Sequence, residues 1–148
     1  MNIPDARDEV RIWQRVRGES APATDGLPGL TAGAMVQAAL YGALARQISG
    51  PGRTILLQLQ EDELAHIRCL KGIYRMAFGM GMNTACVPPT PEKTESALRK
   101  CYGTALKALN AYDARSGNGE YGAVFGMLAA KKREHCYKLA QVMGILGV

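Results

Sequence analysis

Glu63 and His66 stand three residues apart in the segment Leu56–Ala77. Apolar residues recur through this segment at spacings of three and four, which predicts one face of a helix, and both polar residues fall on that face. A carboxylate and an imidazole on a buried face need partners, because burying an unpaired charge is costly. An acid and a histidine at this spacing can bind one metal ion or form one path for proton transfer. The function therefore depends on which other side chains meet this pair in the core.

Four long helices are predicted to position the pair. The first covers about residues 30–48 and the second about residues 53–79, and the short Gly-Pro-Gly turn between them favours an antiparallel hairpin. The third helix is predicted to begin with Thr90 as its N-cap and Pro91 at its first position. The fourth covers about residues 121–146. The longer segment between the second and third helices has room to cross the length of a bundle.

The predicted fold class is all-α. The 148 residues of the chain give room for one core, and the abundance of Ala, Leu and Met favours helices over strands. We expect residues 30–148 to form a four-helix bundle of two antiparallel helical hairpins joined by a crossover. We expect residues 1–29 to form a short N-terminal helix, at residues 5–17, followed by a loop.

Composition and charge exclude several classes of protein. A hydrophobic content of 47% argues against a disordered chain, and a net charge of +5 spread along the sequence gives little reason to expect a nucleic-acid partner. The four cysteines form no Cys-x-x-Cys pair, which argues against a zinc ribbon and favours reduced thiols in a cytoplasmic protein. The segment Leu27–Ala45 carries no charge, but its Gly, Ala, Thr31 and Gln37 favour a core helix over a membrane span.

A repeat supplies a partner for Glu63 and His66. The first half of the chain contains Tyr41 and later His66 with Leu70 four residues after it, and the second half contains Tyr112 and later His135 with Leu139 at the same spacing. Both histidines fall on the core faces of their predicted helices. We therefore expect the two hairpins to be related by a pseudo-twofold axis and to bring His135 to the pair.

These residues resemble the ferritin-like superfamily, and in particular its rubrerythrin-type four-helix bundles. The resemblance covers about residues 30–146 and is strongest in Asp62-Glu63-Leu64-Ala65-His66-Ile67-Arg68-Cys69-Leu70, which is similar to the family pattern Asp-Glu-x-x-His-x-x-x-Leu. It implies that each hairpin supplies a glutamate seven residues before a tyrosine, and a Glu-x-x-His pair from its second helix. In the family these six residues hold two iron or manganese ions.

The chain departs from this family pattern at three of the six ligand positions. Ala34 stands seven residues before Tyr41, Ala105 stands seven residues before Tyr112, and Lys132 stands three residues before His135. Three of the six ligands that the resemblance implies are thus absent, and Glu63, His66 and His135 remain. Glu134 cannot replace a ligand, because a position next to His135 lies about 100° around the helix and points away from the site.

Two interpretations follow for the three remaining ligands. We favour a metal-free polar network in which Lys132 replaces the charge of a cation beside Glu63. In this interpretation no cofactor is bound, and the two imidazoles and one or two amides complete the network; these residues are His66, His135, Gln37 and Gln60. The alternative is a single iron, manganese or zinc ion held by Glu63, His66 and His135, the two-His, one-carboxylate donor set of mononuclear iron sites.

The functions expected from these interpretations differ in class. The first is a ferritin-like bundle of undefined role that has lost its di-iron centre and forms a homodimer or a larger homo-oligomer. The second is a metal-dependent oxidoreductase of rubrerythrin type that acts on peroxide or oxygen. From composition and charge we expect neither a membrane nor a nucleic-acid partner.

Overall fold

The computed structural model describes residues 23–148 apart from residues 88, 91 and 118. Within this part of the chain the structure is all-helical and contains no strand. The long helices are α2 (Leu27–Ala45), α3 (Gly50–Phe78), α4 (Thr94–Asp113) and α5 (Gly122–Leu146), and a short 3-10 helix, η1 (Gly119–Tyr121), precedes α5. The predicted N-terminal helix at residues 5–17 lies outside the described residues.

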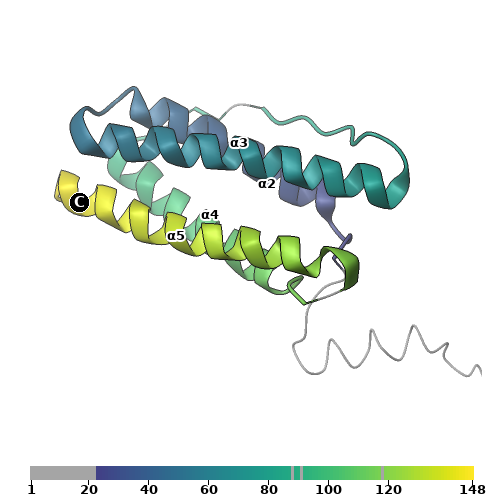
Figure 1. The fold of residues 1–148 in the computed structure, drawn as a ribbon. Helices are drawn as coiled ribbons and strands as arrows, with labels where there is room; N and C mark the ends of the chain where they lie inside the picture. Colours follow the sequence, from purple (N-terminus) through teal and green to yellow (C-terminus); the bar gives the residue numbers. More distant parts are fainter. Residues whose placement is uncertain (1–22, 88, 91, 118) are drawn as a thin grey trace, which may run out of the picture.

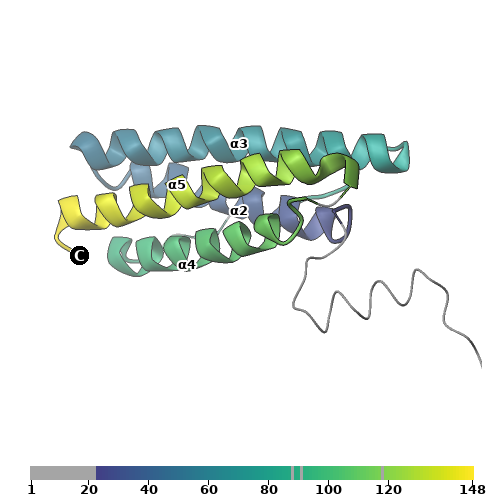
Figure 2. The same cartoon turned by 60° about the horizontal axis from the view of Figure 1, so that its bottom comes forward.

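The four helices form two hairpins that lie side by side (Figure 1). α2 packs against α3 and α4 packs against α5, while α3 and α5 form the main interface between the hairpins. α2 and α4 touch less extensively, which leaves the bundle most open on that side. α3 ends and α4 begins at opposite ends of the bundle, as Figure 1 and Figure 2 both show. The segment between them therefore returns along the length of the bundle.

Two apolar clusters fill the interior. One contains Tyr41 and Leu139 and lies toward the turn between α2 and α3. The other contains Leu70 and Phe125 and lies toward the turn between α4 and α5. All four side chains are fully buried, and burying one such side chain contributes about 1.5–3 kcal/mol. The clusters occupy different stretches of α3 and α5, and the buried residues between them on these helices are polar.

The helix boundaries differ from the predicted ones by a few residues. α2 begins at Leu27, earlier than predicted, because Pro28 fits the first turn of a helix, where its missing N–H is not needed. For the same reason α3 begins at Gly50 with Pro51 in its first turn, so the residues predicted as a turn belong to the helix. α5 begins at Gly122, one residue later than predicted, because the preceding residues form η1.

The prediction that Thr90 caps the third helix is wrong. Lys93 is the N-cap of α4, with φ −53° and ψ 139°, and the helix begins at Thr94. The Thr94 hydroxyl donates a hydrogen bond of 2.9 Å to the side-chain oxygen of Gln47. This bond ties the start of α4 to the turn between α2 and α3. Pro91 lies outside the described residues.

α2 is long and apolar enough to cross a membrane by length and composition alone. Half of its 18-residue apolar window is buried inside the bundle, and Tyr41 and Leu44 are fully covered by the other helices. The hydroxyl of Thr31 donates to the carbonyl of Leu27 at 2.8 Å, so this buried polar side chain is satisfied within the helix. α2 thus supplies part of the bundle core.

Candidate functional site

Four titratable side chains form a buried layer between the two apolar clusters. α3 supplies Glu63 and His66, and α5 supplies Lys132 and His135. The exposed fraction is 0% for Glu63 and His135, 1% for Lys132 and 4% for His66. The spacing of three residues puts the two members of each pair on one face of their helix, one turn apart. The structure therefore brings together the three predicted metal ligands and the lysine predicted beside them; we call these four residues the polar layer.

A buried ion pair lies at the centre of the polar layer. The ammonium of Lys132 contacts carboxylate oxygen Oε1 of Glu63. The same oxygen is faced by Nδ1 of His135 at 3.3 Å and by Nδ1 of His66 at 3.7 Å. Burial raises the pKa of the Glu63 carboxyl, but the facing nitrogens of His135 and His66 and the charge of Lys132 lower it by more. The pKa therefore lies well below its ordinary value, and Glu63 is an anion at neutral pH.

The two imidazoles of the polar layer stack on one another, with ring centroids 5.5 Å apart and ring planes 18° apart. Each imidazole also meets the edge of a tyrosine from the other hairpin: His135 meets Tyr41 and His66 meets Tyr112, both at 6.4 Å between centroids. Burial, followed by the charge of Glu63, raises the pKa of both tyrosines well above the ordinary value, so both phenols are neutral. The repeat in the sequence corresponds to this reciprocal packing of tyrosines and histidines.

Asp62 belongs to the site although it was not among the predicted site residues. Its Oδ2 lies 3.0 Å from Nε2 of His135. A carboxylate at Nε2 orients the His135 ring, so that Nδ1 is the nitrogen directed at Glu63. The signal in the sequence is its position directly before Glu63. Adjacent residues differ by about 100° around an α-helix, so Asp62 lies beside the core face that carries Glu63 but is still within reach of α5.

The structure does not bring Gln37 and Gln60 into the polar layer. The amide nitrogen of Gln37 donates to the hydroxyl of Tyr41 and to the carbonyl of Cys101, both at 3.0 Å. The amide nitrogen of Gln60 donates to the carbonyl of Ala38 at 3.1 Å. These bonds join α2 to α4 and α3 to α2. Gln37 approaches the polar layer only through the tyrosine that contacts His135.

No acidic side chain enters the interior at the positions where the family resemblance implies further ligands. Ala34 and Ala105 are buried methyl groups, with 5% and 0% exposure. Glu134 points away from the site, as predicted, and pairs near the surface with Lys131 at 3.4 Å and with Lys138 at 3.0 Å. Glu63 is therefore the one fully buried acidic side chain among the described residues.

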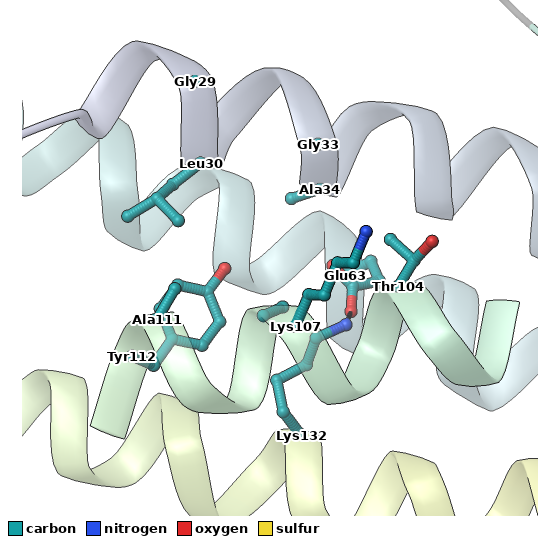
Figure 3. A pocket seen from close by; sticks show the side chains of 11 residues that line it. Gly29, Leu30, Gly33, Ala34, Glu63, Thr104, Lys107, Ala111, Tyr112 and Lys132 are labelled. Carbon is teal, nitrogen blue, oxygen red and sulfur yellow. Dashed lines mark hydrogen bonds and ion pairs between the residues drawn. The ribbon is translucent and has the colours of Figure 1, made fainter. Parts of the chain in front are cut away.

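A pocket of about 230 Å³ opens between α2 and α4 and reaches the ion pair (Figure 3). Its walls are formed mainly by glycine and alanine, and Glu63 and Lys132 lie at its inner end. Ala34 lines it from α2, at a position where a glutamate would fill part of the space. Small residues on a helix can permit close packing, but here they leave a pocket, because α2 and α4 are the neighbouring helices in loosest contact.

The polar layer supplies only part of what a metal site requires. Nδ1 of His66, Nδ1 of His135 and Oε2 of Glu63 are buried and have no hydrogen-bond partner among the described residues. These are ligand types for iron or zinc, but the ammonium of Lys132 already contacts the other oxygen of Glu63. Across the described part of the chain, no group of three or more His, Cys, Asp and Glu side chains is arranged to hold a metal ion.

Comparison with known proteins gives no relative from which to transfer a function: no family model, curated protein or solved structure matches this chain. The polar layer and the pocket that reaches it are the features of this chain that indicate a function.

Proposed function

We propose that this chain is a ferritin-like bundle of rubrerythrin type that has lost its di-iron centre and works as a metal-free binding module. One observation carries this proposal: the ammonium of Lys132 contacts the carboxylate of Glu63 inside the bundle. The family resemblance implies a glutamate ligand at the position of Lys132. The protein's own side chain thus supplies the positive charge that balances Glu63.

The balance of charge supports the proposal. Oε1 of Glu63 already accepts from an ammonium, so a metal ion at Oε1 would have to displace Lys132, and one at Oε2 would bring a second positive charge close to that ammonium. Removing one partner of a buried pair leaves an uncompensated charge, which costs about 3–5 kcal/mol. A di-metal carboxylate centre also uses about four acidic ligands, and Glu63 is the one acid buried in the described interior.

A second candidate function is that of an oxidoreductase with one iron, manganese or zinc ion held by Glu63, His66 and His135. The three buried donor atoms without partners favour it. The carboxylate of Asp62 behind His135 favours it too, since metal-bound histidines commonly have such an outer partner. A bound iron ion would supply redox chemistry toward oxygen or peroxide. This chain's residues would hold the ion and orient one ring, provided that Lys132 left Oε1.

Metal content distinguishes the two candidates. We would express the chain with added iron, manganese or zinc, purify it without chelators and measure each metal per chain by elemental analysis. The native chain should hold each metal at well below one ion per chain. Lys132→Glu should raise the content to one ion or more, because it removes the ammonium and adds a ligand type that the family pattern has at this position.

The control is Lys100→Glu, which makes the same change of charge at an exposed position on α4. This variant should hold no more metal than the native chain. One ion per native chain that is lost in His66→Ala would overturn the metal-free proposal and establish the second candidate.

A further inference from the structure

The pocket between α2 and α4 has apolar walls and a charged inner end. Gly33, Ala34 and Ala108 are among the residues that form the walls. Glu63 and Lys132 form the inner end (Figure 3). The surface that lines the pocket is mostly apolar. Such a shape suits a ligand with an apolar body and one polar group that points inward.

The inner end holds a hydrogen-bond acceptor without a donor. Oε2 of Glu63 is buried, and no described residue donates to it, while Oε1 accepts from Lys132. A buried carboxylate oxygen without a donor is unfavourable, and a ligand that donates to it would remove that penalty. Tyr112 also lines the pocket, and Figure 3 shows its hydroxyl directed toward α2. A polar group of a ligand would therefore find an acceptor, Oε2 of Glu63, and the hydroxyl of Tyr112 nearby.

The charges around the pocket select against ionic ligands. A cation at Oε2 would lie close to the ammonium of Lys132 and would pass Lys107, which lines the exposed part of the pocket. An anion would be repelled by Glu63 at the inner end. An uncharged donor such as a hydroxyl avoids both penalties, because the ion pair is already neutral as a whole.

The size of the pocket limits the ligand to about one ring. A cavity of about 150 Å³ is sufficient for benzene, whereas drug-sized ligands occupy about 300 Å³ or more. At about 230 Å³ this pocket has room for a single ring with a small substituent.

We propose that the pocket between α2 and α4 binds a small, uncharged aromatic molecule that bears a hydroxyl group, and that this hydroxyl donates to Oε2 of Glu63. Phenol is the simplest member of the class and is uncharged at neutral pH. The inference rests on the proposed function in one respect: the carboxylate of Glu63 must not be coordinated to a metal ion.

Three one-ring probes test the proposal on the full chain after treatment with a chelator: phenol, toluene, which lacks a donor, and benzylamine, which is a cation. Binding is followed by titration calorimetry and by backbone amide shifts. Phenol should bind at least about 10-fold more tightly than either of the others, as expected for one hydrogen bond to a charged acceptor, and it should shift the amides of Gly33 and Ala108. Equal affinity for phenol and toluene, or shifts confined to other helices, would overturn the proposal.

Substitutions that fill the pocket locate the binding site. Ala34→Leu on α2 and Ala108→Leu on α4 should each weaken phenol binding about 10-fold or more, since both place a larger side chain in the pocket. Two variants on opposite walls keep the test decisive if one of them fails to fold. Ala39→Leu is the matched control, because Ala39 lies on α2 but lines a different surface hollow. Phenol affinity unchanged in a folded pocket variant would contradict the proposal.

Metal analysis of the same samples separates this proposal from the proposed function. Phenol binding by the stripped chain, together with stoichiometric metal before stripping, would refute the metal-free assignment and support the pocket. Metal-free native protein that does not bind phenol would refute the pocket proposal alone.

Discussion

Replacing Lys132 with methionine should reduce the free energy of unfolding by about 3–5 kcal/mol, because the change leaves a buried carboxylate without its counter-charge. The structure gives the reason for a value of this size. Glu63 is 0% exposed and Lys132 is 1% exposed, so water replaces little of the lost ammonium's stabilisation. The nearest remaining nitrogens are Nδ1 of His135 and Nδ1 of His66, at 3.3 Å and 3.7 Å from Oε1. Methionine has nearly the length of the lysine stem, so the loss reports charge more than packing.

The assay is urea-induced unfolding at pH 7, followed by circular dichroism, for a double-mutant cycle of Lys132→Met and Glu63→Met. Each single variant should be strongly destabilised, and the double variant should recover most of the loss, because a buried pair replaced by apolar side chains leaves no uncompensated charge. The control is Lys131→Met at the adjacent exposed position, where we expect a change of about 0–1 kcal/mol. A loss below about 1 kcal/mol in Lys132→Met, or additive losses in the double variant, would refute the reasoning.

Two further predictions concern pH and helix packing. The pKa of Glu63 is lower in the folded than in the unfolded chain, so the unfolded state binds protons more readily in acid. Stability should fall as the pH drops below the ordinary value of 4.5, and urea unfolding from pH 6 to pH 3 should show a smaller fall in the Glu63→Met, Lys132→Met double variant. Gly122→Ala should reduce stability by about 1–3 kcal/mol, because its Cβ would lie 2.8–3.0 Å from backbone atoms of Gly117. Gly103→Ala, where a Cβ meets no atom within 4 Å, should instead raise stability by about 0.5–1 kcal/mol, as measured by the same urea unfolding.

Periodicity predicted the helices and the centre of the site because both depend on which face of a helix is buried. The spacing of Glu63 and His66 within an apolar stripe put them in the core, and the repeat added His135. Helix ends were predicted less well. Thr90 fits an N-cap preference of about 1 kcal/mol, but the chain begins α4 at Thr94, where a side-chain contact reaches Gln47 in a distant turn.

The remaining features of the site depend on how helices approach one another. Asp62 lies beside the core face of α3, and only the position of α5 decides that its carboxylate reaches His135. Gln37 is buried, as a member of the predicted network should be. Its amide nevertheless bonds to Tyr41 and Cys101 and not to the polar layer, because α4 supplies a carbonyl there. The pocket has no signature in the sequence, since small residues on a helix can permit close packing or leave a space.

The most direct measurement of the central claim is anomalous scattering from crystals of the native chain soaked separately with iron, manganese and zinc. We predict no anomalous peak within the polar layer, and electron density for the Lys132 ammonium against Oε1 of Glu63. A peak bonded to Glu63, His66 and His135 at about 2.0–2.2 Å, with Lys132 turned away, would contradict the claim that an ion pair has replaced the metal.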